Sequence, residues 1–184
     1  MTAPARSLGA TAFAAAMLTL AGPGDAQDAR SLEFGVKATY LYKFAPFVEW
    51  PSSVFPSPTS PLHLCVAGTP VFGELLDRAV AGQRFNEHPI ELDRFPTIDG
   101  PRDCQIMFVS GSPAQPAADI LALLRDAPVL TVTDLPSESA NKGIINFVIR
   151  DHHVRFEIDA RAAAAHHLEI SSKLLALAVS PARE

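Results

Sequence analysis

The feature that most constrains the fold is an alternation of short apolar segments with stretches that carry helix-start signals. Between these segments, Gly68-Thr69-Pro70 and Ser112-Pro113 each place a capping residue before a proline, which is typical of a helix start. We predict one helix that begins at the first signal and ends at about Val80, and a second that begins at the other signal and ends at about Asp126. Largely apolar strands that alternate with helices indicate a buried parallel sheet covered on both faces. The predicted strands are Leu62–Ala67, Cys104–Val109 and Val129–Thr133.

The segments on either side of this core extend the prediction. An apolar stripe at three- and four-residue spacing predicts a first helix over Leu32–Phe44. Phe85–Phe95 reads as an extended strand, and Pro89 places it at an edge of the sheet because proline cannot donate to a ladder. Ile144–Arg150 and Val154–Asp159 flank a short polar turn, which predicts an antiparallel hairpin.

The last stretch of the chain has two interpretations. Ala160–Val179 can form one helix, because apolar residues recur on one face. We favour a break, with Leu168–Ile170 extended and Ser171 capping a short helix over Ser172–Val179. The fold class predicted is α/β: a single domain with a mixed, mostly parallel sheet flanked by helices and a C-terminal antiparallel hairpin.

The N-terminal segment has the organisation of an export signal. Arg6 precedes the apolar stretch Leu8–Ala21, Gly22-Pro23-Gly24 interrupts it, and Gly24 and Ala26 are small residues placed as at a cleavage site. We predict a cleaved signal peptide over 1–26 and a periplasmic domain over 27–184. An uncleaved membrane anchor is the alternative, although the stretch is shorter than the ~20 apolar residues of a usual span.

The charge balance excludes a class of partner. The 15 Lys and Arg against 20 Asp and Glu give a net charge of −5, with no cationic run, so a nucleic-acid partner is not expected.

Two cysteines are too few for a cysteine-rich zinc site. Cys65 and Cys104 lie in predicted strands, and in an exported protein they are expected to form a disulfide. The alternative is two buried thiols that do not meet.

No motif assembles catalytic chemistry. The six histidines lack the spacing of a metal motif, and Ser110-Gly111-Ser112 lacks the full nucleophile-elbow pattern. We therefore predict a non-enzymatic protein with no metal and no cofactor. The loops after two predicted strands lie where α/β sheets bind small ligands, which leaves a ligand pocket open as an alternative. The residues of that candidate ligand loop are Gly68, Thr69, Ser110 and Ser112.

Aromatic residues cluster at the end of the first predicted helix, between Tyr40 and Trp50. One interpretation is that they form core. The other is that side chains outside the buried stripe, such as Tyr42, form a protein-binding patch.

Several segments, in order along the chain, together resemble the YfiR family of small periplasmic proteins. The resemblance rests on the aromatic spacing and Glu-Trp-Pro ending of one segment and on the strands and C-terminal region that follow it. These segments are Val36–Pro51, Leu64–Gly68, Cys104–Val109, Val129–Asp134, Gly143–Phe147, Val154–Asp159 and Ile170–Ala178.

This resemblance implies a binding protein without catalytic residues. It implies repression of cyclic-di-GMP synthesis, and so of biofilm formation, by sequestering the periplasmic sensor domain of an inner-membrane diguanylate cyclase. It also implies a homodimer. Cys65 and Cys104 resemble the structural disulfide of the family. A second cysteine pair found in some members is absent from Leu135–Lys142, so a redox switch through it is not expected here.

The resemblance also points to partner-binding residues. Glu157 resembles a family glutamate on the last strand, beside a C-terminal segment associated with partner binding. A charge on such a strand can also serve only to discourage aggregation. The small residues that follow, including Ala160 and Ala163, would give a smooth surface against which a partner could pack.

Overall fold

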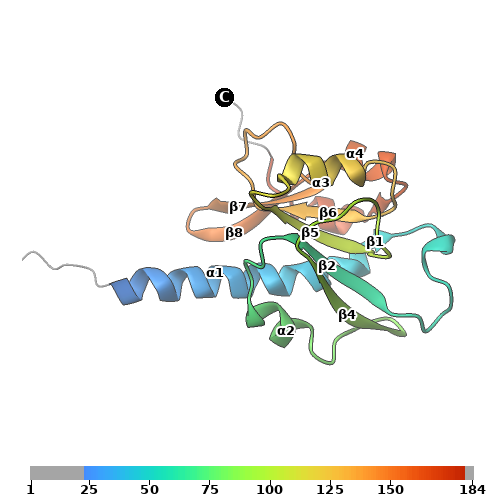
Figure 1. Cartoon of the computed structure of the whole chain (residues 1–184), viewed down its shortest axis with the longest axis horizontal. Coiled ribbons are helices and arrows are strands. Elements are labelled where there is room, and N and C mark those ends of the chain that lie inside the picture. Colours follow the sequence, from blue (N-terminus) through green and yellow to red (C-terminus); the bar gives the residue numbers. More distant parts are fainter. Residues whose placement is uncertain (1–22, 181–184) are drawn as a thin grey trace, which may run out of the picture.

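A computed structural model describes residues 23–180 and shows a curled seven-stranded sheet with helices on both faces (Figure 1). The strand order is β3-β4-β2-β5-β6-β7-β8. The five central strands, β4, β2, β5, β6 and β7, pair in parallel. The two outer strands, β3 and β8, run antiparallel to their neighbours. The predicted α/β class and mixed sheet are confirmed. The strands are β2 (Leu62–Gly68), β3 (Arg84–Phe85), β4 (His88–Phe95), β5 (Ile106–Gly111), β6 (Leu130–Thr133), β7 (Ile145–Arg150) and β8 (His153–Ile158).

The helices divide between the two faces of the sheet. Helix α1 packs against α2 and, through an aromatic cluster, against the β7–β8 hairpin, whereas α3 covers the opposite face (Figure 1). In the aromatic cluster, the ring of Phe44 lies 6.0 Å from that of Phe147 and 5.2 Å from that of Phe156. The helices are α1 (Pro23–Lys43), α2 (Glu74–Val80), α3 (Ala117–Leu123), α4 (Ala160–Ala165) and α5 (Ser172–Leu175), with 3₁₀ turns at Ala45–Phe47 and Ser52–Val54.

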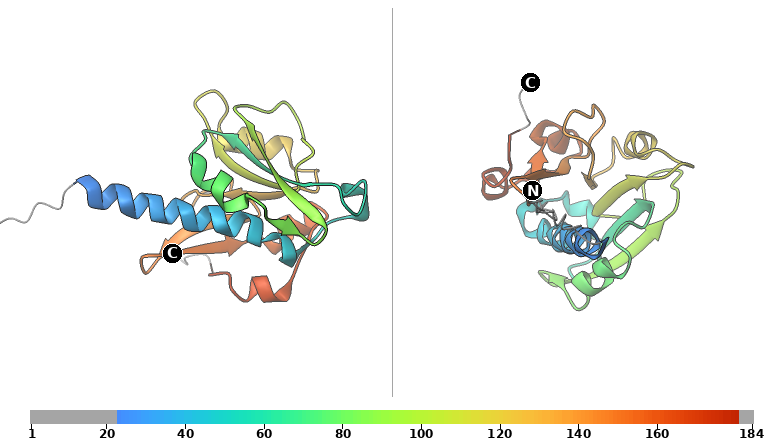
Figure 2. Two further views of the ribbon diagram at one scale, coloured as in Figure 1. Left: turned by 90° about the horizontal axis from the view of Figure 1, so that it is seen from below. Right: turned by 90° about the vertical axis from the view of Figure 1, so that its left-hand side faces the viewer.

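Helix α1 begins nine residues before its predicted start, and its first part projects beyond the sheet (Figure 2). The extension escaped prediction because apolar periodicity begins only at Phe34, while residues 27–32 are exposed. Pro23 occupies the first helical position, where its missing N–H costs nothing, so it starts this helix instead of interrupting it. The predicted signal peptide falls mainly on residues 1–22, outside the described residues, and stays a prediction.

The starts predicted for the next two helices are wrong. Thr69 does not cap α2, because its hydroxyl donates to the carbonyl of Gly111 at 3.0 Å, and α2 begins only at Glu74. Ser112 does not cap α3, because its hydroxyl accepts a bond from the N–H of Gln115 within a separate turn. Each hydroxyl makes a hydrogen bond to backbone of a loop that precedes the helix. A capping pattern in the sequence does not distinguish such a loop bond from a true helix cap.

The prediction of one extended edge strand over Phe85–Phe95 is wrong, because a turn at Asn86 and Glu87 divides it into β3 and β4, which pair antiparallel. Strand β3 pairs with β4 over only two residues, Arg84 and Phe85, so most of β4 forms one margin of the sheet. At the other margin the β7–β8 hairpin closes with the two-residue turn Asp151-His152, both residues with positive φ. Such backbone angles suit the twist of a two-residue hairpin turn, although residues other than glycine adopt them at some cost.

The C-terminal region follows the favoured interpretation, with a break after α4. The segment β9 (Glu169–Ile170) pairs antiparallel with β1 (Val48–Glu49), which follows the first helix. Ser171 then caps α5 through a bond from the N–H of Lys173. The first and last parts of the domain are thereby joined.

Candidate functional site

The candidate site is the surface formed by the β7–β8 hairpin, the loop of residues 134–144 and the start of α4. Glu157, on β8, stands at its centre and is only 4% exposed. Asp159 directly follows the strand and caps α4, because its carboxylate accepts bonds from the N–H groups of Arg161 and Ala162, both at 2.9 Å. Strand and helix therefore meet in a fixed turn beside the buried carboxylate.

Two cations compensate the buried charge of Glu157. The Nζ of Lys142 donates to Oε2 of Glu157 at 2.9 Å, and the guanidinium of Arg150 lies 3.6 Å from Oε1. Lys142 also donates to the carbonyl of Ser137, so it ties the loop to the strand. The Oε1 atom is buried without a hydrogen-bond partner among the described residues. A carboxylate in this position holds the loop in place only while its cations stay close.

The same loop is anchored at its beginning by Asn146. Its Oδ1 accepts from the hydroxyl of Thr133 at 2.7 Å and from the N–H of Leu135 at 3.0 Å, and its Nδ2 donates to the carbonyl of Leu135 at 2.9 Å. The hydroxyl of Thr133 also accepts from the N–H of Gly143 at 2.9 Å. Both ends of the loop are thus bonded to the sheet, without a disulfide in the loop.

A cavity of about 320 Å³ opens between this loop and α4. Its wall carries charges of both signs beside apolar groups. The charged residues in the wall are Lys142, Glu157, Asp159 and Arg161. Such a wall offers hydrogen bonds and ion pairs to a polar partner.

The predicted partner-binding residues do not all share this surface. Ala160 is exposed and lines the cavity beside Glu157. Ala163 is only 1% exposed, so it packs in the core and does not form the smooth surface expected of it. Tyr42 is half-buried against the core on α1 and does not line this cavity.

The predicted ligand-loop residues come together at the carboxyl ends of β2 and β5. A Cβ on Gly68 would lie 2.4 Å from the carbonyl oxygen of Gly111, so the two loops cross in close contact. The hydroxyl of Ser110 donates to the carbonyls of Ala67 and Thr69 at 3.1 and 2.7 Å. These polar groups bind each other, and ligand binding by these loops stays a prediction.

Cys65 and Cys104 form a disulfide with their Cα atoms 6.0 Å apart. Cys65 lies in β2, whereas Cys104 lies two residues before β5 and not in the strand as expected. The bond therefore joins β2 to the segment that leads into the neighbouring strand β5, in the hydrophobic cluster under α3.

One charged residue that the sequence analysis did not single out is deeply buried. Lys37 is 1% exposed on α1, and its Nζ donates to the carboxylate of Asp134 at 2.6 Å and to that of Glu33. It also lies 5.3 Å from the ring centre of Phe34. The signal for it was present, because a lysine stands on the apolar stripe between Phe34 and Leu41.

The described residues contain neither a cluster of metal-ligand side chains nor a helix that could span a membrane. Among residues 23–180, no group of three or more His, Cys, Asp or Glu side chains is placed to hold a metal ion. Within the same range, no helix has both the length and the apolar character needed to cross a bilayer.

Comparison with known proteins places most of the described domain in one family. A search of curated proteins found no match. The family model described as YfiR/HmsC-like matches residues 34–179, which run from α1 past α5 and include the hairpin, the 134–144 loop and the disulfide. This family consists of periplasmic regulatory proteins, and the chain belongs to it.

Proposed function

We propose that this protein is a periplasmic repressor that binds the extracytoplasmic sensor domain of an inner-membrane diguanylate cyclase. The observation that carries the proposal is the family match over residues 34–179. The disulfide between Cys65 and Cys104 supports it, because such bonds persist in oxidising compartments such as the periplasm.

The mechanism requires binding without chemistry. A repressor needs only a higher affinity for the inactive conformation of the cyclase, and a difference of about 3 kcal/mol shifts a two-state equilibrium roughly 150-fold. The surface around Glu157 and Ala160 suits this role, since it joins exposed backbone and charged groups on elements that the Lys142 and Asp159 contacts hold in place. A homodimer is compatible with this mechanism and is part of the proposal.

The test is the cellular concentration of cyclic-di-GMP in the native host with and without the gene. We expect a rise on deletion, restored by the full chain but not by a copy that lacks residues 1–26. A complementing copy with Ala160→Arg should fold and leave the concentration high. An unchanged concentration after deletion would contradict cyclase repression. A saturable thermal shift with a small metabolite would then favour a ligand-binding module.

A further inference from the structure

Strand β8 forms one margin of the seven-stranded sheet, because β7 is its only neighbour in the strand order. The backbone groups of alternate residues in an edge strand point away from the sheet. The N–H of Val179 donates to the carbonyl of Phe156 at 2.9 Å, which identifies Phe156 as an outward-facing position. Val154 and Ile158 share that orientation, since they lie two residues away on the same strand.

The tail of the chain already donates one backbone hydrogen bond to this margin. Residues 176–180 follow α5, and the bond from Val179 is the one backbone hydrogen bond that the described tail makes to β8. The outward-facing groups of Val154, nearer the hairpin turn, have no backbone partner among the described residues. The margin is therefore occupied at Phe156 and open beside Val154.

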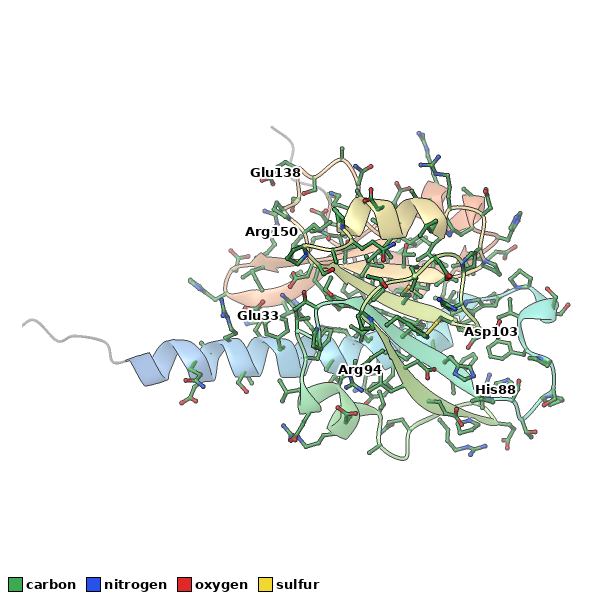
Figure 3. The ribbon with its side chains drawn as sticks, viewed as in Figure 1. Glu33, His88, Arg94, Asp103, Glu138 and Arg150 are labelled. Atoms are coloured by element: carbon green, nitrogen blue, oxygen red, sulfur yellow. A yellow bond between two sulfur atoms is a disulfide. The ribbon has the colours of Figure 1, made fainter. Side chains whose placement is uncertain are left out.

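The side chains along the open part differ between the two faces of the hairpin. On one face Ile149, 48% exposed, stands opposite the half-buried Val154, so an apolar strip reaches the margin. On the other face Arg155 is exposed, and no carboxylate of the described residues lies within 4 Å of its guanidinium. Arg150, visible at the turn end of the hairpin in Figure 3, shares that face with Arg155.

We propose that the open margin of β8 binds an extended segment of the partner protein by strand addition. The backbone of Val154 supplies the hydrogen bonds, and side-chain alternation supplies specificity. A segment in which apolar and acidic residues alternate would extend the Ile149–Val154 strip on one face and pair with Arg155 on the other. This inference rests on the proposed partner-binding function and names the chemistry of the segment recognised.

The experiment places a photo-crosslinking amino acid at Val154 in the full chain expressed in the native host. A second chain carries it at Leu123, an exposed position on α3, as the control. We expect crosslinking from position 154 to a segment of alternating apolar and acidic residues in a membrane sensor protein. The yield should fall at least tenfold with Arg155→Glu but not with Arg78→Glu, an equal charge change on α2 at the other margin.

A second variant tests the backbone contribution. Val154→Pro removes an outward-facing N–H without removing a bond to β7, and it should relieve repression while the melting temperature stays near that of the parent. If this variant does not fold, Arg155→Glu carries the test, because its side chain is exposed.

The outcomes separate this inference from the proposed function. Normal cyclic-di-GMP repression by folded Val154→Pro and Arg155→Glu would overturn strand addition and leave the repressor proposal intact. Crosslinking of position 154 to a second copy of this chain, or equal crosslinking from Leu123, would also overturn it. Crosslinking to the expected segment with no change of cyclic-di-GMP on gene deletion would support strand addition and contradict cyclase repression.

Discussion

The Nζ of Lys142 lies 2.9 Å from a carboxylate oxygen of Glu157, and this contact joins the loop before β7 to the last strand of the sheet. The two residues are 15 positions apart, and the carboxylate is 5% exposed. The loop of residues 134–144 contains no disulfide, so the ion pair between Lys142 and Glu157 holds it against β8. The position of the candidate partner surface therefore depends on a contact that single substitutions can remove.

We expect Lys142→Ala to lower the free energy of unfolding by about 2 kcal/mol, because Glu157 would keep only the more distant Arg150 as a cation. The matched control is Arg102→Ala, which removes an exposed ion pair with Asp99 and should change stability by less than about 0.5 kcal/mol. Urea unfolding at neutral pH measures both. Equal losses for the two variants would contradict a structural role for the Lys142 contact.

We expect removal of the buried Lys37 charge to cost less stability than removal of the charges on its two partners, Glu33 and Asp134. Lys37→Met keeps the apolar stem and leaves two carboxylates, each about a third exposed, that water can reach, so the loss should stay below about 1 kcal/mol. Glu33→Gln with Asp134→Asn leaves the buried ammonium without a counter-charge and should cost about 2 kcal/mol. Thermal unfolding of the purified proteins compares them. A larger loss for Lys37→Met would show that the ion pairs themselves dominate.

Removing the disulfide with Cys65→Ala and Cys104→Ala should lower the free energy of unfolding by about 4 kcal/mol, the chain-entropy value for a loop of 39 residues. Denaturant unfolding of the parent with and without reductant provides the comparison. Alkylation gives an independent check, since thiols should label only after denaturation and reduction together. Rapid labelling of denatured, unreduced protein would refute the bond in the exported chain.

We expect substitution by alanine to have opposite effects on stability at two glycines, Gly68 and Gly35. Gly68→Ala places a Cβ 2.4 Å from the carbonyl oxygen of Gly111, at a residue whose φ is +102°, so it should destabilise the domain by more than about 2 kcal/mol. Gly35→Ala lies within α1 with no atom within 4 Å of its Cβ and should stabilise by about 0.5–1 kcal/mol. Melting temperatures should therefore move in opposite directions, and a parallel shift would count against the described loop crossing.

Two of the five alanines of α4, Ala160 and Ala163, distinguish a surface position from a core position. Ala160→Arg projects into solvent and should leave stability within about 0.5 kcal/mol of the parent, whereas Ala163→Leu overfills a core position and should cost about 1–3 kcal/mol. Repression of cyclic-di-GMP synthesis should be lost with Ala160→Arg despite its normal melting temperature. Full repression by this folded variant would remove Ala160 from the partner surface.

The sequence predicted the strands and the hairpin well because apolar and β-branched runs are short and clearly bounded. Strand β2 was predicted to within one residue, and the hairpin turn was placed correctly between Arg150 and Val154. The break before Ser171 was also predicted, since local capping chemistry favours it. Periodicity and turn residues act locally, so a single sequence carries these signals.

The misplaced features depend on long-range contacts. Thr69 looks like a helix cap until the carbonyl of Gly111, 42 residues away, takes its hydrogen bond. Ala163 looks like surface until the core closes around it. Of the candidate site, Glu157 was predicted from the resemblance and Ala160 from the small residues that follow the strand. The pairing of Glu157 with Lys142 could not be inferred from their spacing. Such pairings appear only once the chain has folded.

The two-residue contact between β1 and β9 sets the order in which this domain can assemble. Val48 pairs with Ile170, so a contact beside the first helix waits for residues near the opposite end of the chain. A nascent chain cannot complete the domain until residue 170 has been made. Contacts so distant in sequence slow folding, because a long loop must close before they form. One of the contacts that close the domain therefore forms only after nearly all of the chain has been made.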